Sequence, residues 1–393
     1  MANGTGVAKI KVIGVGGGGN NAVNRMIFAG VKSASFIAAN TDMQALNMSA
    51  APIKIQLGAA LTKGLGAGSD PEIGERAAEE SKEEIRELLE DTDLLFITAG
   101  MGGGTGTGAA PVIAKMAKEL DILTIAVVTK PFDRFEGKKR MDNAVAGIEK
   151  LREHVDTLLV VPNEKISAFV PKGTPFIKAF QIADDVLRQG IQGIADIITT
   201  PSLINLDFAD IKAIMKNKGN AHIGIGKGKG ENRTLDAVRQ AVQSPLLETS
   251  IQGASGIIVY VAGDEGLTLD EVYEAVGLIK EVVDAGANII FGMGLDENLS
   301  KEVLITIIAT GFDSKNEGKN RYTHIQRPMF TEADTEKMSR MYGYPQETKA
   351  EKSDPREEVA AATDDIPSPR IESGSSKSLP PFLLKLQQKN KGK

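Results

Sequence analysis

Two glycine-rich stretches constrain the fold of this chain more than any other feature. The first runs from Gly14 to Gly19 (GVGGGG) and the second from Gly102 to Gly108 (GGGTGTG). Each follows a short apolar run typical of a buried strand, and each precedes apolar residues at helical spacing. A helix N-terminus carries unpaired backbone N–H groups and a partial positive charge, which favour an anion. The pattern therefore predicts two strand-to-helix turns that together build a phosphate site.

The first stretch, taken alone, is open to other interpretations. Gly14, Gly16 and Gly19 match the G-x-G-x-x-G fingerprint of dinucleotide-binding enzymes, and a tight structural turn would also explain them. The second stretch changes the balance, because five glycines and two threonines in seven residues cost too much chain entropy for a casual connector. A P-loop is excluded, since no Gly-Lys pair in the chain is followed by Ser or Thr.

The composition limits the classes of function. The chain has 393 residues and no cysteine or tryptophan, so disulfides and thiolate metal sites are impossible. Residues 1–312 hold 31 basic and 39 acidic side chains, a net charge of −8, which makes this part a poor nucleic-acid binder. The N-terminus lacks a signal-peptide pattern, and apolar runs are shorter than the roughly 18–20 residues of a membrane span. We therefore expect a cytoplasmic protein with no membrane span and no nucleic-acid partner.

Periodicity predicts an α/β fold with several parts. Residues 9 to about 170 alternate short strands with helical stretches, as in a layer with a largely parallel sheet. A long helix is expected at 175–199, where apolar residues recur at steps of three and four. Residues 220–312 again mix strands and helices. The predicted strands are Ile10–Val15, Ser35–Ala39, Ile53–Gln56, Leu94–Ala99, Leu123–Val128, Thr157–Val161, His222–Gly226, Gly256–Ala262, Asn288–Phe291 and Val303–Thr310, and the other predicted helices are Asn21–Phe28, Ala109–Leu120, Arg233–Gln243 and Leu269–Ala285.

The last fifth of the chain differs in composition. It holds seven of the sixteen prolines and many Ser, Glu and Lys residues, with too little apolar surface to order itself. We predict a disordered linker at 313–377. The end of the chain, 378–393, contains an apolar cluster (LPPFLLKL, 379–386) followed by lysines, which suggests either a partner-binding peptide or a solvated end.

Several motifs together resemble those of the tubulin/FtsZ family, in the form found in bacterial cell division. The second glycine stretch, with Ala109-Ala110-Pro111 after it, is similar to the tubulin signature loop. Further similar segments follow in the same order: NTDMQAL at 40–46, GLGAG at 64–68, FEGKKR at 135–140 and NLDFAD at 205–210. The resemblance covers about residues 8–312. It implies a flexible N-terminus (1–8), a Rossmann-like GTP-binding domain (9–174), a central helix (175–199) and a smaller α+β assembly domain (200–312).

The resemblance implies a GTPase that uses Mg²⁺ with GTP and polymerises head-to-tail into filaments, forming the division ring at mid-cell. Residues 378–393 resemble the peptide by which such proteins dock onto membrane adaptors and division regulators, although Ser378 and Leu379 replace the usual acidic residue and Ile. A dinucleotide (NAD or FAD) enzyme would leave Gly102–Gly108 unexplained. A non-catalytic scaffold is disfavoured by the carboxylates at Asp207 and Asp210.

Base recognition is expected on the long helix. Phe180 and Asp184 are four residues apart and share one face, where a ring can stack on a purine and a carboxylate can accept the N1–H and amine of guanine. Asp185 points about a quarter-turn away, and a core aromatic is the alternative for Phe180. By resemblance Glu136 bonds the ribose and Arg140 lies over ribose and phosphates; a solvated loop is their alternative. The other implied contacts are Gly17, Gly18, Gly19, Asn20, Asn21, Ala67, Gly68, Gly104, Thr105, Gly106 and Asn163, with Asp42 and Gln44 as candidate outer-shell partners of Mg²⁺.

Asp207 and Asp210 are the candidate catalytic residues, which by resemblance orient water and cation at a terminal phosphate. They follow the long helix, whose 25 or so residues span roughly 35–40 Å, so the two ends of that helix cannot share one site. If these carboxylates act on a nucleotide, it belongs to a neighbouring molecule, and the contact propagates as a filament. The structural alternative is N-capping by Asp207 of a helix that begins near Phe208.

Overall fold

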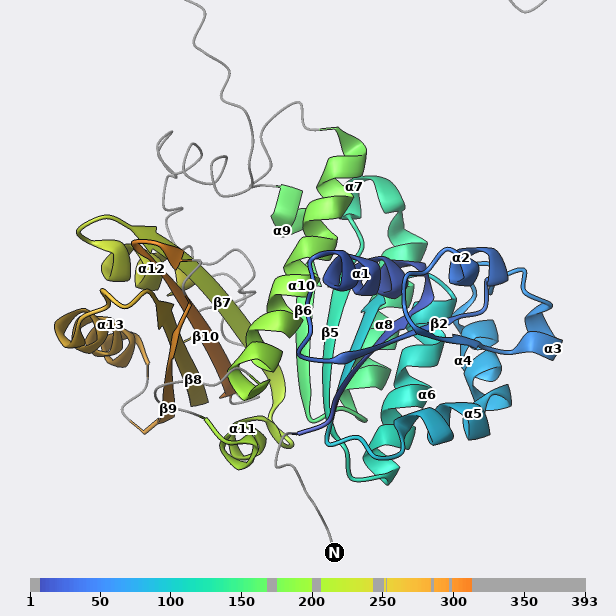
Figure 1. Ribbon diagram of the computed structural model, residues 1–393. Coiled ribbons are helices and arrows are strands. Elements are labelled where there is room, and N and C mark those ends of the chain that lie inside the picture. Colours follow the sequence, from blue (N-terminus) through green and yellow to red (C-terminus); the bar gives the residue numbers. More distant parts are fainter. Residues whose placement is uncertain are drawn as a thin grey trace, which may run out of the picture. The chain divides into compact units, whose positions relative to one another are not determined.

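The computed structural model describes residues 8–167, 175–199, 206–242, 251, 253–283, 286–296 and 299–312. Within these residues the strands form a ten-stranded sheet in the order β3-β2-β1-β4-β5-β6-β7-β10-β8-β9 (Figure 1). The expectations for residues 313–377 and 378–393, and for most of the N-terminal segment, lie outside the described residues. No helix in the described part of the chain is both long enough and apolar enough to traverse a bilayer.

The first six strands are parallel to their neighbours. They are β1 (Ile10–Val15), β2 (Ser35–Asn40), β3 (Ile53–Gln56), β4 (Leu94–Gly100), β5 (Leu123–Lys130) and β6 (Thr157–Pro162). The helices between and after them are α1 (Gly16–Phe28), α2 (Met43–Asn47), α3 (Ala59–Thr62), α4 (Pro71–Glu80), α5 (Lys82–Leu89), α6 (Thr105–Glu119), α7 (Asp133–Glu136), α8 (Lys138–Arg152) and α9 (Asn163–Ser167). Because helices cover both faces of this parallel sheet, its central strands read as continuous apolar runs, as predicted.

Side chains that alternate along β1 enter different cores, as the two-residue period of a strand requires. Val12 joins a core that includes Val23 of α1 and Ile191 of α10 (Phe176–Thr199), whereas Ile13 joins a core that includes Ile113 of α6. The first core continues through α10 to Ile223 and Ile308 in the second half of the sheet. The long predicted helix therefore packs on both halves (Figure 1).

The second half of the sheet is mixed. The strand β10 (Glu302–Phe312) is antiparallel to both β7 (Gly219–Lys229) and β8 (Ala254–Gly263), and β9 (Asn288–Leu295) is parallel to β8. The helices here are α11 (Phe208–Met215), α12 (Arg233–Val242) and α13 (Leu269–Val282). The predicted α/β architecture, with a mostly parallel sheet, a long helix and a second α+β part, is confirmed.

Three local expectations were wrong or incomplete. Helix α1 begins at Gly16 rather than Asn21, and α6 begins at Thr105 rather than Ala109, so glycines form the first turns of both helices. Helices α4, α5 and α8 were not predicted, although Asp70 accepts from Glu72 N at 2.9 Å and Pro71 stands at the first position of α4. These are strong N-terminal signals. Charged residues dominate the sequence of these helices and obscure the apolar periodicity that would predict them.

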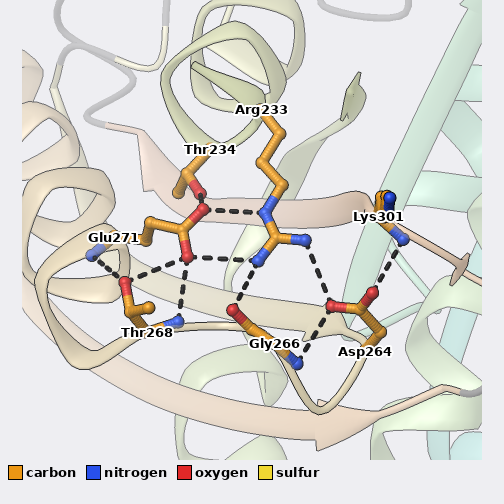
Figure 2. A network of polar contacts seen from close by, with 7 residues as sticks. All are labelled: Arg233, Thr234, Asp264, Gly266, Thr268, Glu271 and Lys301. Carbon is orange, nitrogen blue, oxygen red and sulfur yellow. Dashed lines mark hydrogen bonds and ion pairs between the residues drawn. The ribbon is translucent and has the colours of Figure 1, made fainter. Parts of the chain in front are cut away.

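A polar cluster around Arg233 joins three segments of the second half (Figure 2). The Arg233 guanidinium donates to Glu271 (Nε–Oε1 2.7 Å), Asp264 (Nη1–Oδ1 3.1 Å) and the Gly266 carbonyl (2.8 Å). Asp264 also accepts from Lys301 N at 2.7 Å, and Glu271 forms a capping box with Thr268. We call Arg233, Asp264 and Glu271 the arginine clamp. It connects α12 with the loop after β8 and the first turn of α13, and Asp264 links that loop to the turn before β10.

Candidate functional site

The two glycine turns meet at the carboxyl edge of the sheet. Strands β1 and β4 are parallel neighbours, and the chain runs outward from them in opposite directions, through β2 and β3 on one side and β5 and β6 on the other. This is the topological switch point at which open α/β sheets bind ligands. A Cβ placed on Gly16, which has φ +70°, would lie 2.9 Å from Gly106 N. The N-termini of α1 and α6 are therefore in contact.

The space at these turns differs from one glycine to the next. A Cβ on Gly19 would lie 2.2 Å from the Thr98 carbonyl oxygen, whereas a Cβ on Gly17 would meet nothing within 4 Å. Gly19 is thus required for packing of α1 on β4. Gly17 faces open space, which leaves its backbone accessible to a ligand.

A third segment closes on the second turn. A Cβ on Gly104 would lie 2.8 Å from Ala67 Cβ, and the hydroxyls of Thr41 and Thr105 are 2.6 Å apart. Gly68, with φ +58°, has open space around it. The structure therefore brings the predicted residues Ala67, Gly104 and Thr105 together, although Ala67 lies in a different segment from Gly104 and Thr105.

Asp42 and Gln44 lie beside that segment, at the start of α2. Asp42 Oδ1 caps α2 by accepting from Ala45 N at 3.1 Å, and Met43 N donates to Gly64 O at 3.1 Å. Gln44 is exposed. The described residues contain no group of three or more His, Cys, Asp or Glu side chains arranged to hold a metal ion. A lone carboxylate near a phosphate site suits Mg²⁺, which takes most of its ligands from phosphate and water.

Glu136 and Arg140 form an ion pair with Oε2–Nη1 at 2.9 Å, and Glu136 Oε1 accepts from Phe132 N at 2.8 Å. The Arg140 backbone borders the second glycine turn, because a Cβ on Gly102 would lie 2.7 Å from Arg140 O. The structure therefore places this pair beside the second glycine turn, with the Arg140 side chain 49% exposed.

A cavity of about 660 Å³ opens between α1 and α10. Its lining residues come from these helices and the residue after α1: Asn21, Asn24, Arg25, Phe28, Ala29, Ile177, Phe180, Gln181, Asp184, Asp185 and Arg188. Phe180 stands edge-on to Phe132, with ring centroids 5.2 Å apart. The predicted residues Asn21, Phe180 and Asp184 thus share one cavity that contains aromatic and polar groups.

Asp184 is the more buried of the two acids here. Its Oδ2 lies 3.4 Å from Arg25 Nε, and burial raises the pKa of Asp184 to about 6, an effect that the charge of Arg25 partly offsets. Asp185 is engaged elsewhere, with its Oδ1 2.7 Å from Arg188 Nε. Arg25 was not singled out from the sequence, although it lies one helical turn after Asn21, at a spacing that puts both side chains on one face.

Some buried polar atoms near these turns have no hydrogen-bond partner among the described residues. They are both amide atoms of Asn20, which is 3% exposed, Oδ1 of Asn163, which is 5% exposed, and Oγ1 of Thr98. A buried unpaired polar group costs about 1–3 kcal/mol, so each requires an explanation. Asn20 and Asn163 were both predicted to contact a nucleotide, and a polar ligand at the carboxyl edge would supply the missing partners.

Asp207 and Asp210 do not join this site. Asp207 is exposed and caps α11 by accepting from Asp210 N at 2.8 Å, as the N-capping alternative predicted. At the other end of α11, Thr157 Oγ1 donates to Met215 O at 2.6 Å. Thr157 is the first residue of β6, so α11 lies near the amino edge of the parallel strands (Figure 1). The glycine turns lie at the opposite edge.

The fold and site together define a nucleotide-binding α/β protein whose phosphate turns lie at the switch point of a parallel sheet. A sequence model of the Tubulin/FtsZ family GTPase domain matches residues 9–171, and one of the FtsZ family C-terminal domain matches 219–313. The empty FtsZ dimer of M. jannaschii is 49% identical, with 77% of this chain and 88% of that chain covered and a TM-score of 0.73. The chain therefore belongs to the tubulin/FtsZ family.

Two further solved structures are similar. A substituted form of the M. jannaschii FtsZ is also 49% identical and covers 78% of this chain and 92% of its own, with a TM-score of 0.74. CetZ2 from Haloferax volcanii, a GTPγS-bound protofilament, is 20% identical. The match covers 85% of this chain and 98% of the CetZ2 chain, with a TM-score of 0.67. At that identity the likeness concerns the fold alone. These matches do not favour the dinucleotide-enzyme alternative.

Proposed function

We propose that this protein binds GTP between its two glycine turns and hydrolyses it when molecules stack head-to-tail into a filament. The observation that carries the proposal is the contact of Gly16 with Gly106, which directs two helix N-termini at one point of the carboxyl edge. Family membership supports the choice of GTP, and the dimer of the similar M. jannaschii protein supports assembly of copies of this chain.

In this proposal the triphosphate lies along the first turns of α1 and α6. Gly17, Gly18 and Gly19 hold it from one side and Gly104, Thr105 and Gly106 from the other, while Ala67 and Gly68 close over the terminal phosphate. Glu136 bonds the ribose hydroxyls, and Arg140 neutralises phosphate charge. Asn20, Asn21 and Asn163 complete the polar contacts. Asp42 and Gln44 would hold Mg²⁺ through water, and the ion would supply charge neutralisation at the phosphates.

The base occupies the cavity between α1 and α10, with its plane against Phe180. Asp184 accepts the N1–H and the exocyclic amine of guanine. Adenine has an acceptor at N1 and no amine at C2, so it would leave most of the hydrogen-bonding capacity of this partly buried carboxylate unused, which disfavours binding. The GTP-over-ATP preference therefore rests on one carboxylate.

Hydrolysis is assigned to the next molecule in the row. Asp207 and Asp210 lie at the amino edge of the parallel strands, and the nucleotide turns lie at the carboxyl edge, so the two groups meet only between molecules. Asp207 is exposed, as a residue that must reach a neighbour has to be. The carboxylates would orient water and cation at the neighbour's terminal phosphate.

Two substitutions separate catalysis from capping. Asp207→Asn keeps a side-chain acceptor for the Asp210 N–H, and Asp210→Ala leaves that N–H and the cap intact. We expect both variants to bind GTP with unchanged affinity and to release phosphate about 100-fold more slowly or worse. For the unsubstituted protein, phosphate release per molecule should rise with protein concentration through a threshold.

The matched control is Glu83→Gln, which neutralises an exposed acid in the first turn of α5. It should keep full turnover and the same threshold. Full turnover in Asp210→Ala would exclude that residue from catalysis. Turnover strictly proportional to protein concentration would exclude the shared site.

The division ring at mid-cell and the role of the C-terminal peptide belong to the same proposal. The apolar cluster in 378–393 would dock membrane adaptors or division regulators. Removing these residues should leave GTP turnover and filament assembly intact while localisation to mid-cell is lost; unchanged localisation would rule out this role.

A further inference from the structure

Arg25 approaches the acid that is assigned to base recognition. It lies on α1, and its Nε is 3.4 Å from Asp184 Oδ2 on α10. The Arg25 side chain is 32% exposed and that of Asp184 is 19% exposed, so solvent screens the pair only in part. The other charged groups facing Asp184 among the described residues are Asp185 and its partner Arg188, both on α10. Arg25 is thus the cation that α1 contributes to this carboxylate.

The contact uses little of the hydrogen-bonding capacity of Asp184. Arg25 Nε is its one hydrogen-bond partner within the described residues, and that bond is long. An ionised carboxylate accepts about four hydrogen bonds through its two oxygens. Asp184 therefore keeps enough capacity to accept two donors from a base while Arg25 stays in place.

Base reading depends on the charge state of this group. A protonated carboxyl carries an O–H donor and cannot accept the two parallel N–H groups of guanine. Burial favours the neutral form and raises the pKa of Asp184 to about 6, and the repulsion from Asp185 acts in the same direction. Arg25 acts against both, through its charge and its hydrogen bond.

We propose that Arg25 is a positioning residue for base recognition, which holds Asp184 ionised and directed at the cavity and thereby sets the lower pH limit of guanine-nucleotide binding. The inference rests on the proposed function, because it assumes that the base occupies the cavity between α1 and α10. It adds a residue that the base itself need not touch.

The test is the affinity for GDP, measured by calorimetry from pH 5 to pH 8.5. The unsubstituted protein should lose affinity below about pH 6, approaching tenfold per pH unit for a single proton. In Arg25→Ala the midpoint moves to higher pH, so affinity falls severalfold at pH 6.5 and stays close to that of the unsubstituted protein at pH 8.5. Arg25→Lys keeps the charge and should restore most of the original profile.

Two further variants check the route of the effect. Arg152→Ala removes an arginine of similar exposure, 35%, from an ion pair with Glu149 on α8, and its profile should match the unsubstituted one. Asp184→Asn cannot ionise at this position, so it should bind GDP weakly and keep only the pH dependence that the terminal phosphate of GDP contributes near pH 6 in every variant. The double variant, with Arg25→Ala added to Asp184→Asn, should therefore show the same pH profile of GDP affinity as Asp184→Asn alone.

The outcomes separate the two proposals. If GDP binds and Arg25→Ala shows the same midpoint, or loses affinity equally at every pH, Arg25 does not act through the charge of Asp184 and the inference is overturned while the proposed function stands. If the unsubstituted protein binds no GDP at any pH, the proposed function fails, and the inference fails with it. Circular dichroism of each variant establishes that it is folded.

Discussion

Two arginine–carboxylate sites, one in each half of the sheet, show how differently the same chemistry can be used. In the arginine clamp, Arg233 donates to two carboxylates and a carbonyl, and its side chain is 10% exposed. In the cavity between α1 and α10, Arg25 reaches a single oxygen of Asp184 at 3.4 Å. Hydrogen bonding in the clamp lowers the pKa of Glu271 to about 2, whereas burial raises the pKa of Asp184 to about 6.

The difference lies in how completely each carboxylate is paired. Oε2 of Glu271 also accepts from the Thr268 backbone N–H at 2.9 Å and from its hydroxyl at 3.0 Å, so no ligand is needed to stabilise the charge. Asp184 is partly buried, with much of its accepting capacity unused. A saturated ion pair stabilises the fold, while an unsaturated one beside a cavity is suited to recognition.

The largest expected effect comes from removing the two arginines in turn. Arg233→Ala leaves two carboxylates without their shared cation and should lower the free energy of unfolding by about 3 kcal/mol. Arg25→Ala removes one long contact between two groups that solvent partly screens, so it should change the free energy of unfolding by less than about 1 kcal/mol. Urea unfolding of the nucleotide-free variants measures both. Equal losses of unfolding free energy in the two variants would show that both arginines stabilise the fold to the same extent.

Neutralising the acids should change stability in opposite directions. Glu271→Gln weakens the clamp and the capping box and should lower the free energy of unfolding by about 2 kcal/mol at pH 7.5. Asp184→Asn removes a charge that burial disfavours, so the nucleotide-free protein should become more stable by about 1 kcal/mol. Thermal melts compare the two variants. A destabilised Asp184→Asn would mean that Arg25 already compensates the buried charge.

The smallest effect is a difference in pH dependence. Asp184 has a folded pKa of about 6, above its ordinary 3.8, so its stabilising contribution is present below pH 3.8 and is lost as pH rises through 6. Glu271 has a folded pKa of about 2, below its ordinary 4.5, so its contribution is present above pH 4.5 and is lost as pH falls through 2.

The stability difference between the unsubstituted protein and Asp184→Asn should therefore vary by about 1 kcal/mol between pH 7 and pH 5. The difference for Glu271→Gln should be constant there and shrink only below pH 4.5. Urea titrations without nucleotide at several pH values provide the measurement. A constant difference for Asp184→Asn over pH 5–7 would contradict the assignment.

Much of the fold could be predicted because its signals are local. The strands β1, β3 and β4 were predicted within one residue of their bounds from apolar runs, and α10 from steps of three and four. The cap at Asp207 was also predicted from its position before Phe208. Helix α4 was not, although Asp70 and Pro71 mark its start, because its charged sequence hides the small buried face formed by Gly74, Ala77 and Ala78.

The candidate site was predictable only in part. The glycine turns and the shared face of Phe180 and Asp184 follow from spacing along the chain. Arg25 lies 159 residues from Asp184 in sequence, and no pattern in one helix indicates which residue of another helix will face it. The unpartnered amides of Asn20 and Asn163 likewise became visible only once burial was known.

By itself, the sequence determined the elements and the chemistry that each one carries, because periodicity, glycine turns and helix caps depend on neighbouring residues. Only the tertiary structure decided that Gly16 meets Gly106 and that Arg25 meets Asp184. It also separated Asp207 from the glycine turns, at opposite edges of the parallel strands. These relations depend on strand order and helix packing, which bring together or keep apart residues that the chain alone leaves unrelated.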